Sequence, residues 1–368
     1  RVSDRCLNEK MKAALISLGS QSSEWTIEEM RKYFDSVDDI DIKNVEVNLS
    51  SDKSNVLYNG RPLGNYDCIY AKGSFRYAQT LRAITGAFYP TAYMPMKAGA
   101  FTVGHDKLLT HFFLQKFKIP MPTTYLSSSP TAAKKILQKI NYPIIFKFPS
   151  GTGGKGVMYA ESFAAASSLM DALETLRQPF LIQEYIETGG EDIRAIVIGD
   201  KIAAAMKRKA IIGEKRANVH AGGEGEAFIP DAHMKKIAVE AARSIGADIC
   251  AVDMLESIKG PVVVELNLSP GLQGITKATG VNVAERIAQY LYYRTKQFKE
   301  KGTKRGTGEI MKAIAVEKGA KEQQIITNLD FRGERILLPK LVTTIGKFDE
   351  KDEFIVKVKR GKIEIERA

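Results

Sequence analysis

The sequence contains little cysteine and no long apolar run. Its three cysteines, Cys6, Cys68 and Cys250, are far apart in the 368 residues and lack the close spacing of zinc ligands. This spacing excludes a zinc site or a disulfide framework built on them. Cys68 and Cys250 lie in apolar, strand-like segments, so we expect buried free thiols and a reducing cytoplasm.

Patterns for membrane insertion and export are also missing. The uncharged stretch 83–96 is too short to cross a bilayer and contains one glycine and two prolines. No secretory signal is visible, so the sequence predicts a cytoplasmic protein without a membrane partner. Acidic residues are outnumbered: 54 Lys and Arg stand against 43 Asp and Glu. The net charge of +11 favours anionic partners, whether small acidic ligands or nucleic acid.

A glycine-rich loop follows an apolar strand at 144–157, IIFKFPSGTGGKGV. It is not the common nucleotide-binding loop, because Lys155 is followed by Gly156 and not by Ser or Thr. Glycines let backbone N–H groups surround an anion, and Lys147 and Lys155 add positive charge. The stretch predicts a polyphosphate site, with a plain flexible turn as the alternative.

A second group of polar residues lies in 248–271, where two apolar strands flank a Lys-Gly turn as in a hairpin. Glu265 and Asn267 are two residues apart, so they share one face of a strand, and Asp253 can face them from the first strand. Two carboxylates and an amide oxygen suit Mg²⁺. Metal binding is favoured over a hairpin of solvated acids, because an unpaired acid among apolar residues is costly.

Several separated motifs occur in a fixed order within residues 11–297. They are HDKLLT (105–110), IPMPTT (119–124), the glycine loop, QEYIE (183–187), EDIRAIVIGDKIAAAMKR (191–208), RANVHAGG (216–223), AVDML (251–255) and VVVELNLSPGL (262–272). Together they resemble the ATP-grasp superfamily and its RimK-type branch of carboxylate–amine ligases. The resemblance implies phosphoryl transfer from ATP to a carboxylate, attack of an amine on the acyl-phosphate, and two Mg²⁺ (or Mn²⁺) ions.

The resemblance also implies which residues bind ATP. Lys107 and Lys147 match lysines that contact the α- and β-phosphates, and Asp192 matches an acid that binds the ribose. The remaining expected contacts are the loop, the adenine-binding hinge and a nucleotide-contacting pair: Gly151, Gly153, Gly154, Lys155, Gly156, Glu184, Tyr185, Arg216 and Asn218.

Further roles implied by the resemblance concern the chemistry. Arg208 matches a catalytic arginine near the transferred phosphoryl group, and Asn267 is expected in catalysis as well as in metal binding. The expected metal ligands are Asp253, Glu265 and Asn267. Arg194 is expected to help hold the carboxylate substrate.

One departure from the family pattern concerns the substrate. RimK-type enzymes usually have an arginine between the His and the Gly-Gly of N-x-H-R-G-G, whereas Ala221 stands here. A cation for a substrate carboxylate is therefore missing at this position. Glutamate is the family's commonest amine donor, but the departure leaves the amine donor of this chain open. The first domain offers Lys72, Arg76 and Arg82 as candidate anion contacts, with plain surface charge as the alternative for each.

The predicted fold is α/β (α+β): an ATP-grasp fold preceded by a small open α/β domain and followed by a small β-rich domain. Residues 1–10 are interpreted as an upstream extension or a cloning remnant. The remaining parts are expected at 11–104 (open α/β domain), 105–184 (glycine-loop subdomain), 185–298 (metal-site subdomain), 299–309 (polar, Gly-rich linker) and 310–368 (β module).

The C-terminal segment 326–367 resembles the AbrB/SpoVT-type swapped-hairpin module, although Lys351 stands where that module usually has Gly. We expect a hairpin turning at 360–361 and a homo-oligomer, a dimer or higher, formed through this module. The expected buried set is Ile355, Val358, Ile363 and Ile365. The alternative function is a DNA-associated metabolite sensor, but 17 Lys and Arg against 12 Asp and Glu over 299–368 give only +5, too mild to require nucleic acid.

Overall fold

The computed structural model describes residues 10–51, 54–89, 91–127, 129–149, 151, 156–175, 177, 179–210, 225–316, 330–332, 335–337, 353–359 and 362–367. The chain divides into two compact units, 1–301 and 302–368, and the long helix α9 (Val283–Val316) runs across the boundary. No helix in the described ranges combines the length and the apolar character needed to cross a membrane. Cys68 and Cys250 are buried free thiols, as predicted, and Cys6 lies outside the described residues.

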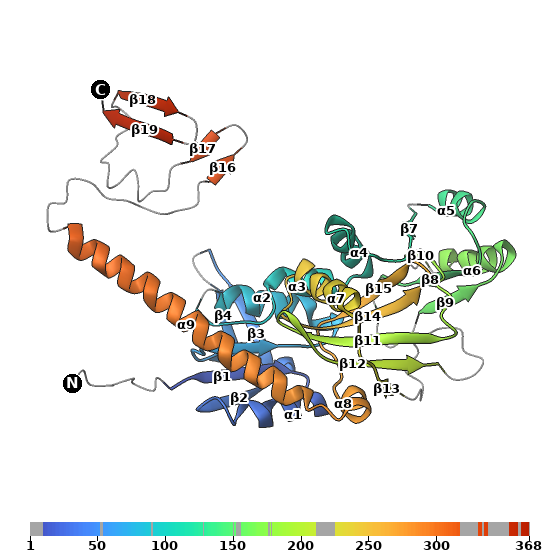
Figure 1. Cartoon of the computed structure of the whole chain (residues 1–368), viewed down its shortest axis with the longest axis horizontal. Helices are drawn as coiled ribbons and strands as arrows, with labels where there is room; N and C mark the ends of the chain where they lie inside the picture. The colour runs from blue at the N-terminus through green and yellow to red at the C-terminus, as the bar shows by residue number, and fades with distance from the viewer. Residues whose placement is uncertain are drawn as a thin grey trace. The chain divides into compact units, whose positions relative to one another are not determined.

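The first unit begins with a small open α/β layer (Figure 1). The apolar strand β1 (Lys12–Ser17) lies between two parallel partners, β2 (Ser36–Asp41) and β6 (Cys68–Ala71). Because parallel strands end at the same edge of a sheet, Ser17 and Lys72 lie side by side at the carboxyl edge, where ligands bind in open α/β sheets.

Short helices and a separate small sheet complete this layer. Helix α1 begins after Ser20, whose side chain accepts a hydrogen bond from the Ser23 amide and so caps the first turn. Within 45–62, three short strands form an antiparallel sheet separate from the open one. The elements are α1 (Gln21–Met30), α2 (Ala78–Phe88), α3 (Ala98–Gly104), η1 (Ile42–Asn44), η2 (Phe75–Tyr77), β3 (Val45–Leu49), β4 (Ser54–Tyr58) and β5 (Arg61–Pro62).

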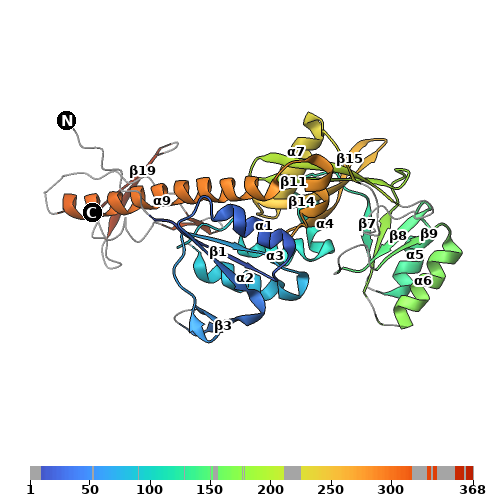
Figure 2. The same ribbon diagram turned by 90° about the horizontal axis from the view of Figure 1, so that it is seen from below.

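The glycine-loop part has its own antiparallel sheet and its own apolar core. Figure 2 shows helices α5 (Pro130–Leu137) and α6 (Phe163–Thr175) together on one side of this sheet. Helix α4 (Lys107–Lys116) precedes it in the chain. The sheet order is β7 (Thr124–Leu126), β10 (Leu181–Glu184), β8 (Ile144–Lys147) and β9 (Val157–Ala160).

The largest sheet follows and is antiparallel throughout. Its order is β13 (Gly225–Ala227), β12 (Lys201–Lys209), β11 (Glu191–Ile198), β14 (Ile249–Ser257) and β15 (Gly260–Asn267). Helices α7 (Ala232–Ser244) and α8 (Gln273–Thr279) belong to the same part. One continuous apolar core includes this sheet and the N-terminal layer, so the two are held in a fixed relation around the site.

The second unit contains two described antiparallel hairpins, β16 (Asp330–Arg332) with β17 (Arg335–Leu337) and β18 (Phe354–Lys359) with β19 (Lys362–Arg367). The second hairpin matches the predicted turn at 360–361. The predicted face is wrong at one position: the register pairs Val356 with Ile365 and Val358 with Ile363, so Ile355 lies on the opposite face. Residues 338–352 of the AbrB-like segment, Lys351 among them, lie outside the described residues.

The segment 299–309, predicted as a linker, is helical, because α9 continues through it to Val316. The boundary between the two compact units, Lys301/Gly302, falls inside this segment. The glycines of the segment indicated coil, but each costs a helix only about 1 kcal/mol. The lysines and glutamates around them favour helix.

Candidate active site

A cavity of about 460 Å³ brings together residues from three parts of the first unit. The N-terminal layer contributes Ser17 and Lys72, helix α4 contributes Lys107, and the largest sheet contributes Glu265 and Asn267. Several of the predicted site residues, which are widely separated in the sequence, therefore lie around one space.

Strand register explains how the charged side chains meet. Asp253 on β14 lies directly opposite Glu265 on β15, as the hairpin pattern predicts. On its other side Asp253 lies opposite Arg194 of β11. Asp192, two residues before Arg194, lies opposite Arg208 of β12. Residues two apart on a strand share a face, so these five side chains form one charged row across four strands.

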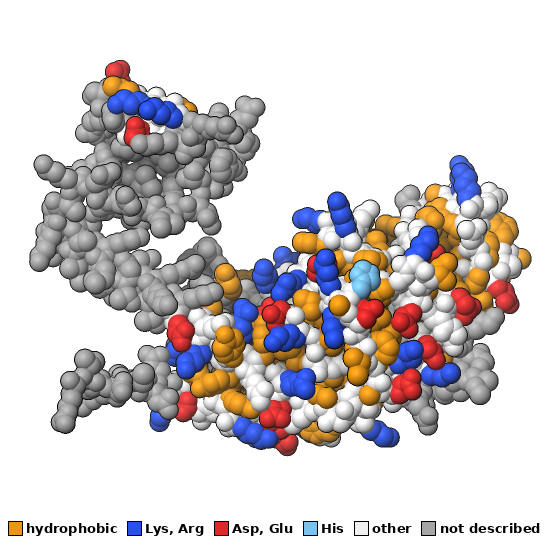
Figure 3. Space-filling view, viewed as in Figure 1, with side chains coloured by type: hydrophobic (Ala, Val, Ile, Leu, Met, Phe, Trp, Pro, Cys, Tyr) orange, Lys and Arg blue, Asp and Glu red, His pale blue; other side chains and the backbone are white. Residues whose placement is uncertain are grey.

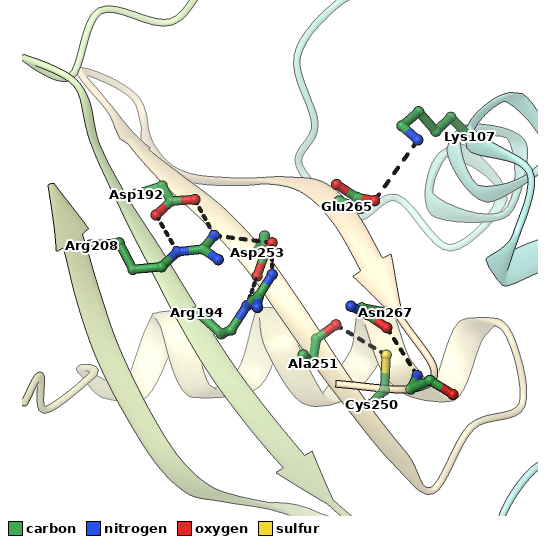
Figure 4. Close-up of polar contacts among 10 residues, drawn as sticks. Lys107, Asp192, Arg194, Arg208, Cys250, Ala251, Asp253, Glu265 and Asn267 are labelled. Atoms are coloured by element: carbon green, nitrogen blue, oxygen red, sulfur yellow. Dashed lines mark hydrogen bonds and ion pairs between the residues drawn. The ribbon is translucent and has the colours of Figure 1, made fainter. Parts of the chain in front are cut away.

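The row is tied together by buried ion pairs (Figure 4). Arg194 donates from Nε and Nη2 to the two oxygens of Asp253, at 2.8 and 2.7 Å. Arg208 donates from Nε to Asp192 at 2.7 Å and from Nη2 to Asp253 at 3.1 Å, and its Nη2 also donates to Asp192. Such bidentate geometry fixes both orientation and charge.

These pairs shift the pKa values of the two aspartates in opposite directions. Burial alone would raise the pKa of Asp253, but Arg194 and Arg208 outweigh burial and hold it well below its usual range. Burial raises the pKa of Asp192 to about 6, because the hydrogen bond from Arg208 offsets burial only in part and Asp253 adds repulsion. Asp253 is thus the firmly ionised member of the row.

The three expected metal ligands differ in exposure and in their contacts. Asp253 has a side chain that is 3% exposed and accepts from two guanidinium groups. Glu265 is more open, with 26% of its side chain exposed and Lys107 Nζ at 3.8 Å. Asn267 Oδ1 accepts from the Ser269 amide at 2.9 Å and keeps a second lone pair.

These two oxygen donors fit Mg²⁺, which takes few protein ligands and completes its shell with water and phosphate oxygens. Within the described part of the chain, no three His, Cys, Asp or Glu side chains are grouped as a closed metal site. Glu265 and Asn267 are therefore the side chains best placed to hold the ion.

Two lysines lie next to the glycine loop. Lys107, at the start of α4, donates from Nζ to the Gly151 carbonyl at 2.9 Å. Lys147, at the end of β8, is 7% exposed, and burial lowers its pKa to about 8 although Glu265 partly offsets this effect. Gly156 has φ +77°, and a Cβ there would lie 2.3 Å from the Phe148 ring, so only glycine fits.

The predicted hinge lies where β10 leads towards β11. Glu184 Oε2 accepts from the Thr123 amide at 3.1 Å, and the Tyr185 ring lies 5.2 Å from the Tyr159 ring. The ribose role expected for Asp192 conflicts with the structure, because this side chain is fully buried and both its oxygens accept from Arg208. A carboxylate so engaged has no open face for a sugar hydroxyl.

The predicted substrate contacts also change. Arg194 lines the cavity, but its guanidinium is held by Asp253 and is not free for a substrate. Arg76 is exposed and does not line the cavity. Five expected ATP contacts, Gly153, Gly154, Lys155, Arg216 and Asn218, lie outside the described residues, as does Ala221.

Sequence reasoning missed two histidines of the cavity wall, His105 and His111. His111 is 5% exposed, and burial, with Lys147 and Lys107 nearby, lowers its pKa to about 4. The sequence feature that could have identified them is their position, one on each side of the Asp106-Lys107 start of α4.

Comparisons with known proteins decide the family. A RimK-like ATP-grasp domain model matches residues 104–291. The chain belongs to the RimK-like ATP-grasp family. It is 37% identical over 255 residues to a "Probable alpha-L-glutamate ligase" of Vibrio cholerae, covering 68% of this chain and 85% of that protein. A protein of the same description from Thioalkalivibrio sulfidiphilus is 35% identical over 286 residues, covering 76% of this chain and 95% of that protein.

Solved structures agree on the fold. The ATP-grasp ligase PsnB complexed with a minimal precursor matches with a TM-score of 0.61 and 17% identity, over 77% of this chain and 98% of that chain. The D-cycloserine synthetase DcsG matches with a TM-score of 0.57 and 15% identity, over 77% of this chain and 99% of that chain. The α/β ATP-grasp fold and the expectation of an ATP-dependent ligase are thereby confirmed.

Proposed function

We propose that this RimK-like ATP-grasp ligase joins an amino acid, with glutamate as the first candidate, to a carboxylate of a small molecule or protein. The reaction passes through an acyl-phosphate. The observation that carries the proposal is the meeting of Lys107, Glu265 and Asn267 around one cavity beside the glycine loop. The glutamate ligase description of its relatives supports the choice of amino acid.

In this proposal Lys107 and Lys147 hold the phosphates and neutralise part of their charge. Glu265 and Asn267 would hold Mg²⁺ (or Mn²⁺), used as two ions, which would supply the remaining positive charge when bound. Arg208 stabilises the transferred group through its Nη1, which is buried and has no hydrogen-bond partner in the described part of the chain. The glycine loop and the hinge bind the rest of ATP through Gly151, Gly153, Gly154, Lys155, Gly156, Glu184, Tyr185, Arg216 and Asn218.

The experiment is a product screen with the full chain. The protein is incubated with ATP, Mg²⁺, glutamate or another amino acid, and a panel of carboxylates and peptides, and the products are identified by mass spectrometry. A product heavier than the carboxylate by one amino-acid residue, formed only with ATP, is expected. ATP consumption without any amide product across the panel would count against the amine-donor assignment.

The second unit supports a further part of the proposal, a homo-oligomer formed through the hairpin β18–β19. Three apolar side chains on one face of this hairpin are open to solvent in the single chain: Val356 (55%), Val358 (70%) and Ile363 (53%). A two-stranded hairpin is marginal in water and gains stability when such a face is covered. A second copy supplies the same apolar face.

DNA binding by the second unit is the alternative. Residues 299–368 carry only five more Lys and Arg than Asp and Glu, a balance that does not require nucleic acid. Figure 3 shows Lys and Arg interspersed with Asp and Glu over the visible described face of the first unit, so that face presents no continuous basic stripe either.

A further inference from the structure

Lys72 is a buried lysine in the wall of the cavity. It follows β6 directly, and its backbone amide donates to the Ile16 carbonyl at 2.9 Å, which extends the pairing with β1. The residue is only 5% exposed, yet it lines the same space as Glu265 and Asn267. The sheet edge therefore holds this cation in place at the site.

The charge of Lys72 lacks an acidic partner among the described residues. Its Nζ lies over the Tyr70 ring, 5.8 Å from the ring centroid. Burial lowers the pKa of Lys72 to about 8, and no neighbouring acid raises it again. The other cations of the cavity differ, because Arg194 is bound by Asp253 and Lys107 is near Glu265. An unpaired buried ammonium group is costly in free energy, which indicates that a bound ligand pairs with its charge.

The surroundings of Lys72 suit an anion. Besides Lys72, the N-terminal layer contributes four serines to the lining, Ser17, Ser20, Ser23 and Ser74, and no acidic residue. Ser17 Oγ accepts from the Gly19 amide at 3.1 Å, so its own hydrogen is available for donation. The acids of the lining, Asp253 and Glu265, come from β14 and β15 instead.

We infer that Lys72 is a specificity-determining residue that binds a carboxylate group of a substrate. The inference rests on the proposed function, because the proposed ligase reaction brings a carboxylate substrate into this cavity. It also supplies the cation that Ala221 does not provide. The carboxylate belongs either to the amino-acid donor or to the acceptor, and both would present the same chemistry to Lys72.

The test is calorimetric binding to the full chain in the presence of ADP and Mg²⁺. The probes are L-glutamate, glutarate and L-glutamine, and the variants are Lys72→Met and Lys72→Arg, with Arg76→Met as the control for an exposed cation. Because Lys72→Met removes a charge-assisted hydrogen bond, its carboxylate affinity should fall roughly 10- to 100-fold. Lys72→Arg keeps the charge and should keep most of the affinity. Loss for glutamate alone identifies the donor, and loss for glutarate identifies an acceptor-type carboxylate.

Other readouts separate this inference from folding and from the proposed reaction. Lys72→Met removes an unpaired buried charge, so its melting temperature should equal or exceed that of the parent, and ADP·Mg²⁺ affinity should not change. Equal carboxylate affinity in Lys72→Met and the parent would overturn the inference. Failure of the ligase reaction itself would show in the product screen, whatever Lys72 binds.

Discussion

Arg194 and Asp253 face each other on the neighbouring strands β11 and β14 and are joined by two hydrogen bonds of 2.8 and 2.7 Å. Arg208 adds a third bond to the same carboxylate, at 3.1 Å. Asp253 therefore compensates two buried guanidinium groups in addition to any part it takes in metal binding. Glu265 lies opposite Asp253 on β15 and, among the described residues, forms no ion pair with an arginine.

Substitution of Asp253 should destabilise the fold. Asp253→Asn leaves Arg194 and Arg208 buried with less opposing charge, and breaking a buried pair in this way costs about 3–5 kcal/mol. Urea denaturation followed by fluorescence should show this loss in the free energy of unfolding. An unchanged midpoint in Asp253→Asn would mean that the arginines do not depend on this carboxylate.

Glu265→Gln is the matched contrast, because it removes a charge from the same hairpin pair. The side chain is partly exposed, and its nearest cation, Lys107, is 3.8 Å away. We expect turnover with Mg²⁺ to fall by orders of magnitude while the melting temperature stays equal or rises, since the repulsion from Asp253 is removed. Normal turnover in Glu265→Gln would end the assignment of Glu265 as a metal ligand.

His111 predicts a pH dependence of stability. Burial lowers its folded pKa to about 4, with Lys147 and Lys107 adding repulsion, whereas an unfolded histidine has its ordinary value of 6.5. The unfolded chain thus binds more protons between these values, so the stability due to neutral His111 is present above about pH 6.5 and lost as pH falls towards 4. Melting scans from pH 7 to 4.5 should show a shallower fall for His111→Leu. Parallel curves for the two proteins would contradict this prediction.

The apolar face of the β18–β19 hairpin predicts how the chain assembles. Val358→Lys places a charge on the face shared with Val356 and Ile363 and should lower the mass measured by light scattering. Ile355→Lys makes the same chemical change on the opposite face and should leave the mass unchanged. A parent-like mass in both variants would show that this face does not join copies.

Local patterns were enough to predict the hairpin and the pairing of Asp253 with Glu265, because both depend on strand periodicity and one short turn. The contacts of Asp253 with Arg194 and Arg208 could not be predicted. They depend on the pairing of β11 with β14 and β12, which long-range packing sets. The burial of Asp192 escaped prediction for the same reason.

Two other misses have different causes. An offset of one residue in register moves a side chain to the other face of a strand, which is why Ile355 was placed with Val358. Lys72 was recognised as a candidate anion contact, but its burial was not predicted. The burial follows from the pairing of β6 with β1, which the spacing of charges along the sequence does not reveal.

The most direct test of the central claim follows the oxygen atoms of the activated carboxylate. The carboxylate found in the product screen is labelled with ¹⁸O and incubated with ATP, Mg²⁺ and the amine donor. Phosphoryl transfer predicts ADP, phosphate carrying one ¹⁸O, and a hydroxamate when hydroxylamine replaces the amine. Release of pyrophosphate with ¹⁸O in AMP would mean adenylation of the carboxylate and would contradict the account.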